Sequence, residues 1–233
     1  MSANDPARVS LLARAFDYPY IRCQSPVLFD RGQFRPLPLI KAHARRDGLV
    51  EVELGVSGPA TLCLPMLALG SNAALSVLRR KFGDRPTGIV QDTVRIADLQ
   101  VVHSAHIARY GAMPATLTAA AGQQSIVHVQ LIPLSLLSRL DRSEAVGVNY
   151  ERRGLAMRIA LTRLQVRLAH VWVYQSRHGP VKTANGPLPL GSQRRALAYA
   201  AGRVGWMEPL EAFAIALARD ANLRSQTSQA LKG

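Results

Sequence analysis

The stretch that decides the fold is Leu62-Cys-Leu-Pro-Met-Leu-Ala-Leu69, which continues into Gly70-Ser-Asn72. A short apolar run that ends at a glycine is typical of a buried strand. The segment 73–82 then repeats apolar residues at helical spacing, and Gly83 provides a C-terminal stop. We therefore expect a strand, a turn at residues 70–72, and a helix that uses Asn72 as its N-cap.

The turn at residues 70–72 is a candidate binding element. Backbone N–H groups at the start of a helix lack partners within the helix, so they attract anions such as a carboxylate. Gly70 would also let the backbone approach a ligand closely. The same pattern fits an ordinary connection between a strand and a helix, so by itself it does not establish a site.

The rest of the chain alternates between strand and helix patterns. Runs of alternating or continuous apolar residues predict further strands at 49–56, 94–103, 112–121, 125–132, 155–160 and 165–174, with a turn at 122–124. Helical spacing predicts helices at 10–16, from Pro133 towards Glu144, at 193–203 and at 208–224. We expect an α+β fold, namely a small mixed β-barrel flanked by helices and followed by a helical C-terminal tail.

Three regions follow from this pattern. Residues 1–58 form an N-terminal extension, residues 59–190 the central domain, and residues 191–233 a helical segment. Prolines interrupt the extension between residues 17 and 38, so we expect irregular structure there.

Composition limits the classes of function. The chain has 233 residues, of which 48% are apolar, and no apolar stretch reaches the roughly 18 residues of a membrane span. The first residues lack a signal-peptide pattern, so we expect a soluble cytoplasmic protein with no membrane partner. The two cysteines, Cys23 and Cys63, could form one disulfide, although two reduced thiols are the simpler expectation.

The formal charge of +14 invites an acidic partner such as nucleic acid. The arginines, however, are spread from Arg8 to Arg224 without a dense block, and aromatic residues make up only 6% of the chain. Few aromatic side chains are therefore available to stack on bases. We do not expect a specific nucleic-acid function.

Glu144 is the candidate catalytic residue. It follows Leu140-Asp-Arg-Ser143 at the end of an apolar helix, where a carboxylate can be partly buried. Burial raises the pKa of a carboxyl group towards neutrality, which suits general acid–base catalysis. The alternative is a solvated charge at a helix end.

The segment His103-Ser-Ala-His106 permits two competing sites, a metal-binding pair or a Ser–His dyad. Residues three apart on a strand point to opposite faces, so the two histidines would share one metal poorly, and no third ligand is evident. We expect these histidines to be structural or exposed. Trp172 and Trp206 are expected to be core residues.

Residues 60–178 resemble the γ-glutamyl cyclotransferase family in the order and spacing of their motifs. The matching segments are Leu69-Gly-Ser-Asn72, Gly111 to Leu117, Leu140 to Glu144, Tyr150, and Val171-Trp-Val-Tyr174. Members of that family usually have Tyr before Gly-Ser-Asn. Leu69 keeps the backbone of the loop but lacks a hydroxyl group.

The resemblance implies a small-molecule γ-glutamyl substrate. The free α-amine of the γ-glutamyl group attacks its own γ-carbonyl, which releases an amine and 5-oxoproline. Glu144 would move the proton. The loop of Leu69, Gly70, Ser71 and Asn72 would bind the substrate, with the N–H groups of Gly70 and Ser71 holding its carboxylate. Three further residues would line the pocket, namely Gly111, Tyr150 and Tyr174.

The implied reaction requires no metal, nucleotide or other cofactor. A second interpretation stays open, a non-catalytic domain of the same fold that binds a small carboxylate or a protein partner. In either case, Glu144 and the backbone of Gly70 and Ser71 are expected to line one pocket.

Overall fold

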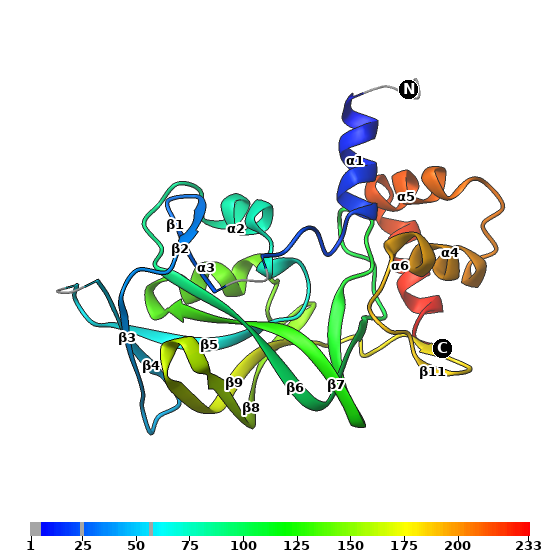
Figure 1. Cartoon of the computed structure of the whole chain (residues 1–233). Helices are drawn as coiled ribbons and strands as arrows, with labels where there is room; N and C mark the ends of the chain where they lie inside the picture. Colours follow the sequence, from blue (N-terminus) through cyan, green and yellow to red (C-terminus); the bar gives the residue numbers. More distant parts are fainter. Residues whose placement is uncertain (1–5, 24–25, 56–57) are drawn as a thin grey trace. The chain divides into compact units, whose positions relative to one another are not determined.

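The computed structural model describes residues 6–23, 26–55 and 58–233, and these group into two compact units. The helical unit takes the residues up to 20, residues 100–120 and residues 178–233. The sheet unit takes residues 21–99 and 121–177. Figure 1 shows the elements of both in chain order.

One sheet carries the described strands apart from one small hairpin. Its order is β2-β1-β6-β7-β5-β4-β3, with β9 beside β5 and β8 beside β9. The strands are β1 (Val27–Asp30), β2 (Gln33–Pro36), β3 (Ile40–Ala44), β4 (Val50–Leu54), β5 (Thr61–Ala68), β6 (Ile89–His103), β7 (Ala115–Pro133), β8 (Tyr150–Leu161) and β9 (Val166–Ser176). Because β5 and β9 run parallel and the other registered pairs are antiparallel, the sheet is mixed.

Two helices lie against the curled sheet, α2 (Leu75–Phe82) and α3 (Leu134–Ser143) (Figure 1). Their apolar faces pack with strand residues into one buried cluster, which consists of Phe29, Leu64, Met66, Leu78, Phe82, Ile89, Ile132, Leu140 and Tyr174. The predicted α+β class is confirmed, as a half-barrel sheet with flanking helices and a helical C-terminal tail.

The sheet branches at β5, which confirms the strand predicted at 62–69. One edge of β5 pairs with β7, while the other edge pairs first with β4 and then with β9. Pro65 falls between these last two pairings, because the register with β4 ends at Cys63 and the register with β9 begins at Met66. A proline, which has no N–H to donate, is tolerated in a sheet where the ladder is interrupted.

The region before β5 is more regular than the sequence predicted. The strand expected at 49–56 is present as β4, but residues 27–44 also contain β1, β2 and β3. The prolines of this region bound the strands, because Pro36 is the last residue of β2 and Pro38 lies between β2 and β3. The expectation of irregular structure was therefore wrong here, while the division of the chain after residues 58 and 190 stays a prediction.

β7 is one strand of 19 residues, where two strands joined by a turn were predicted. Gly122 lies inside it with φ +75°, and its N–H donates to Asp98 Oδ1 at 2.8 Å. Asp98, on the neighbouring β6, also has a positive φ of 57°. Each of the two strands thus has one residue in a left-handed conformation, and neither ends there.

The helical unit contains α1 (Pro6–Phe16), α4 (Gln193–Arg203), α5 (Leu210–Arg219), α6 (Ala221–Ala230) and a hairpin of β10 (Lys182–Thr183) and β11 (Gly186–Pro187). The helices predicted at 10–16 and 193–203 are confirmed. The helix predicted at 208–224 is two helices, because the Asp220 carboxylate accepts from the N–H groups of Asn222 and Leu223 and so caps α6.

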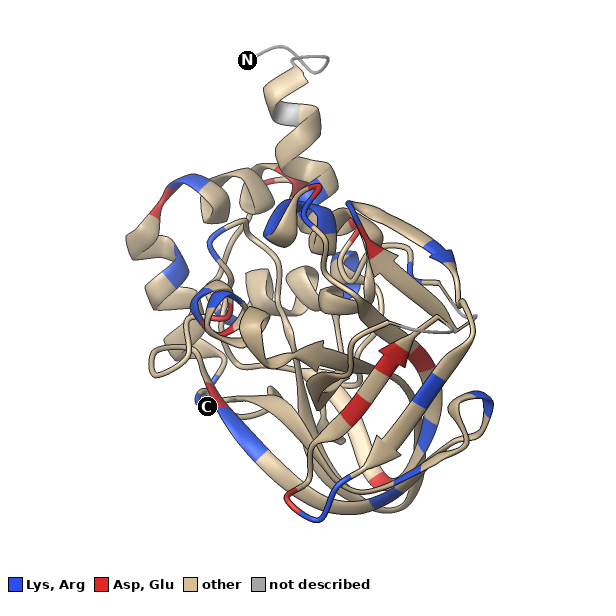
Figure 2. Ribbon diagram, turned by 90° about the vertical axis from the view of Figure 1, so that its left-hand side faces the viewer, with Lys and Arg blue, Asp and Glu red and all other residues tan. Residues whose placement is uncertain are grey.

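Three general features of the described residues concern membrane helices, charge and the cysteines. None of their helices has both the length and the apolar character needed to cross a lipid bilayer. Figure 2 shows Lys and Arg on helices and strands alike, interspersed with Asp and Glu. Cys23 and Cys63 are both free thiols. The absence of a specific nucleic-acid partner stays a prediction.

Candidate functional site

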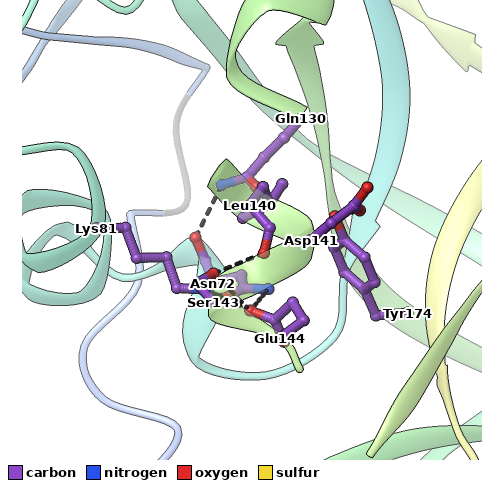
Figure 3. Close-up of polar contacts among 8 residues, drawn as sticks. All are labelled: Asn72, Lys81, Gln130, Leu140, Asp141, Ser143, Glu144 and Tyr174. Carbon is purple, nitrogen blue, oxygen red and sulfur yellow. Dashed lines mark hydrogen bonds and ion pairs between the residues drawn. The ribbon is translucent and has the colours of Figure 1, made fainter. Parts of the chain in front are cut away.

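The turn after β5 presents the side chain of Asn72 to α2 and α3. Residues Ser71–Ala73 form a short 3₁₀ turn, and Ala74, not Asn72, occupies the N-cap position of α2. The predicted cap was wrong because the Asn72 amide has other partners. Its Nδ2 donates to Glu144 Oε1 at 3.2 Å, and its Oδ1 accepts from Lys81 Nζ at 2.7 Å (Figure 3).

Glu144 is the C-cap residue of α3, and its backbone N–H donates to the carbonyl of Leu140 at 3.1 Å. Its side chain is 13% exposed, so it is not a solvated charge at a helix end. Lys81 Nζ forms an ion pair with Oε1, and the Ser143 hydroxyl approaches the same oxygen at 3.5 Å. Each of these contacts of the carboxylate involves Oε1.

Sequence reasoning missed Lys81 and Gln130. Lys81 lies in the last turn of α2, and Gln130 on β7 donates from Nε2 to the Asn72 carbonyl at 2.9 Å and to Gln91 Oε1 at 2.8 Å. Gln130 and Gln91 are buried and hold the backbone of the turn. The rarity of lysine was the one hint for Lys81: only four of the 29 Lys and Arg residues are lysines.

Tyr174 and Tyr150 lie in the sheet unit, and Tyr174 contacts α3 close to Glu144. The Tyr174 hydroxyl donates to Asp141 Oδ1 at 2.7 Å, and Arg152 Nη1 pairs with Asp141 Oδ2 at 2.7 Å. Burial and the bond to Asp141 raise the pKa of Tyr174 far above its usual 10, so the phenol stays protonated. Tyr174 thereby anchors α3 one turn before Glu144, while Tyr150 packs half-buried against the same core.

Gly111 belongs to the helical unit, in which it packs against α5. It has φ +85°, and a Cβ at this position would lie 2.8 Å from the Ala214 carbonyl oxygen. The close approach of α5 and the left-handed backbone therefore explain the glycine. Its role as a pocket residue stays a prediction.

Substituting Gly111 with alanine is expected to destabilise the protein more than the same change at Gly122. Both glycines have positive φ, which costs an alanine about 1–2 kcal/mol, but a Cβ at Gly122 would meet no atom within 4 Å. The collision with the Ala214 carbonyl adds to that cost only at Gly111. Urea unfolding of Gly111→Ala and Gly122→Ala measures the difference, and equal losses would show that α5 yields to the added methyl group.

The His103–His106 segment forms a buried cluster in the helical unit. Ser104 Oγ and His106 Nδ1 are 2.8 Å apart, and the His106 ring lies 4.4 Å from that of His178. Ser104 is fully buried, whereas a nucleophile must be reachable by substrate. Among the residues that the structure describes, no three His, Cys, Asp or Glu side chains gather as they would around a metal ion.

The stability of the folded chain is expected to decline as the pH falls below about 6.5. Burial lowers the pKa of His103 from 6.5 to about 4 and that of His106 to about 3. Between these pKa values the two histidines are protonated in the unfolded chain but not in the folded chain. Each histidine therefore lowers the free energy of unfolding by about 1.4 kcal/mol per pH unit between pH 6.5 and its folded pKa. Urea unfolding is measured at a series of pH values from about 7 to about 4. The free energy of unfolding should fall less steeply with pH for His106→Gln than for the parent.

A groove of about 770 Å³ occurs elsewhere in the sheet unit. It lies along the β2–β3 connection, β3 and residues 163–165, and none of the predicted site residues lines it. A pocket shared by Glu144 and the Gly70-Ser71 backbone thus stays a prediction. What the structure brings together is Asn72 of that turn, Lys81 and Glu144.

Comparison with known proteins gives a likeness of fold. No family model matches the chain, and no curated protein does. Among solved structures, it is similar to a gamma-glutamyl cyclotransferase, with a TM-score of 0.40 and 14% identity, covering 71% of this chain and 98% of that one. It is also similar to an Arabidopsis thaliana protein solved in solution (TM-score 0.38, 14% identity, 63% and 94% covered) and an uncharacterized Homo sapiens protein (0.39, 14%, 70% and 97%). These values describe a likeness of fold and say nothing about activity.

Proposed function

We propose that this chain is a cyclotransferase that acts on a γ-glutamyl or similar isopeptide small molecule. The observation that carries the proposal is the hydrogen bond between Asn72 and Glu144, which are 72 residues apart. Through it, the Gly-Ser-Asn turn and the carboxylate at the end of α3 meet at one point. These are the two motifs to which the sequence resemblance gives chemical roles.

The proposed reaction needs one proton carrier. The substrate α-amine forms a bond to the γ-carbonyl carbon, the bond from that carbon to the leaving nitrogen breaks, and 5-oxoproline and an amine result. Glu144 takes the proton from the attacking nitrogen and returns it to the leaving nitrogen. Because the nucleophile lies within the substrate, correct folding of the substrate supplies much of the acceleration.

The contacts of Glu144 suit this role. Without a ligand, Asn72 and Lys81 both donate to Oε1, while Oε2 has no such partner among the described residues. The N–H groups of Gly70 and Ser71 would bind the substrate carboxylate at the turn that also carries Asn72. Leu69 is buried and adds no polar group there.

A second function is favoured by one specific contact. Lys81 already neutralises the carboxylate that a general base would offer to substrate. A domain that only binds a small carboxylate or a protein partner has no need of a free base, and the ion pair would then be structural. The choice between the two functions depends on turnover.

Mass spectrometry of 5-oxoproline release tests the proposal. Purified protein is incubated with a panel of γ-glutamyl amines and γ-glutamyl peptides, and each peptide is paired with its α-linked isomer. Release from the γ-linked compounds alone is expected, because the α-linked isomers carry no leaving amine on the γ-carbonyl. If none of the γ-linked compounds turns over but some raise the melting temperature, the binding function replaces the proposed one.

A further inference from the structure

The Lys81 ammonium lies in a cradle made by two side chains. Its Nζ donates to Glu144 Oε1 and to Asn72 Oδ1, the latter at 2.7 Å. The Asn72 amide nitrogen donates to the same Glu144 oxygen at 3.2 Å, so the three groups form a closed ring (Figure 3). The side chains of Lys81 and Glu144 are only 11% and 13% exposed.

The composition of the cradle defines the group that it accepts. Towards Lys81, it offers one carboxylate oxygen and one amide oxygen, which are both acceptors. A primary ammonium has three N–H donors and no acceptor, so it matches this pair. Because Glu144 is largely buried, its charge needs a cation beside it, since an unpaired buried charge is strongly destabilising.

Lysine differs from arginine in how readily it can leave such a site. Its ammonium is a compact charge on a flexible stem of four carbons, whereas a guanidinium is a rigid planar fork. The Lys81 side chain is largely buried but not completely enclosed, since 11% of it is exposed. A ligand that carries its own ammonium can then replace Lys81 at Oε1 without leaving Glu144 unpaired.

We infer that Asn72 and Glu144 form a primary-ammonium subsite, which Lys81 fills when no ligand is bound and vacates when a ligand ammonium enters. Lys81 is then a specificity-determining residue, because a ligand without an ammonium cannot compensate for its departure. The identity of that ligand as a γ-glutamyl compound rests on the proposed function. The subsite itself rests only on the contacts of these three side chains.

Shortening Lys81 to alanine and supplying the missing atoms as propylammonium tests the subsite. Lys81→Ala is expected to lower the melting temperature by roughly 5–10 °C, because it leaves the Glu144 charge unpaired. Propylammonium chloride should restore at least half of that loss in a saturable manner. At matched ionic strength, propan-1-ol and tetramethylammonium should restore none of it, because the first lacks the charge and the second lacks N–H donors.

Three variants control the measurement. Lys41→Ala removes an exposed lysine that lies 3.8 Å from Glu53, so it should neither lower the melting temperature appreciably nor respond to propylammonium. Adding Glu144→Gln to Lys81→Ala should abolish the rescue. If Lys81→Ala fails to fold, Lys81→Met keeps most of the side-chain volume, and ammonium chloride becomes the probe.

The inference is overturned if propan-1-ol rescues Lys81→Ala as well as propylammonium does, or if no amine rescues it. Its failure is distinguishable from failure of the proposed function. Rescue by the amine without 5-oxoproline release from the parent protein would keep the subsite and remove the cyclotransferase. Release by the parent without rescue would keep the cyclotransferase and make the Lys81 contact purely structural.

Discussion

Replacing Glu144 with glutamine is expected to lower 5-oxoproline release by roughly two to four orders of magnitude, the usual contribution of a general acid–base group. Glutamine retains an oxygen that can accept from Asn72 and Lys81, so the turn and α3 should stay joined. It cannot take a proton from the attacking amine. The loss should therefore appear in kcat when release is followed by mass spectrometry over a range of substrate concentrations.

Matched substitutions show whether that loss is specific to Glu144. Asp141→Asn makes the same chemical change one turn earlier on α3, where the carboxylate holds Tyr174 and Arg152, and we expect less than about a tenfold loss of kcat. Ser104→Ala and His106→Ala should also retain release. An active Glu144→Gln protein beside an inactive His106→Ala protein would refute the proposed mechanism and revive the Ser–His interpretation.

Replacing Phe29 with alanine is expected to destabilise the protein by about 3–5 kcal/mol. Phe29 on β1 is fully buried, and its ring lies 5.9 Å from that of Phe34 and 6.4 Å from that of Phe82. The truncation would leave a cavity among β1, β2 and α2. The midpoint of urea unfolding measures the loss, and Ile21→Ala, at a side chain that is 94% exposed, should change it by less than about 0.5 kcal/mol.

The Phe29 experiment also tests the predicted boundary after residue 58. If residues 1–58 were an independent extension, Phe29→Ala would loosen them without shifting the main unfolding transition. The buried contact between Phe29 and Phe82 of α2 favours the opposite result, a single transition at lower urea. A main transition unchanged within error would support the boundary.

Local patterns in the sequence predicted the elements whose apolar residues form a recognisable repeat within one segment of the chain. The path from β5 through the turn to α2 follows from one apolar run and one helical repeat, and strands were predicted at 155–160 and 165–174, where β8 and β9 lie. β1 escaped prediction because its four residues are buried by distant parts of the chain, among them β6, about sixty residues later. The prolines beside these short strands therefore led to a wrong prediction of irregular structure.

The candidate site shows the same limit at single residues. Local rules make Asn72 a helix cap, but a carboxylate 72 residues away and the Lys81 ammonium compete for its amide. The sequence could propose Glu144 from its place after an apolar helix. It could not place Lys81 on that carboxylate, because a lysine in the last turn of a helix is ordinarily explained by the helix dipole alone.

The interleaving of the two units restricts how the protein can be divided by recombination. The chain changes from one unit to the other after residues 20, 99, 120 and 177. A single crossover after residue 99 or 120 would divide both units, and one after residue 20 or 177 would divide the helical unit, so neither unit can be inherited or exchanged as one contiguous module. Transplanting the sheet unit into another protein would require new linkers that rejoin its two segments, 21–99 and 121–177, with β6 and β7 each cut within the strand.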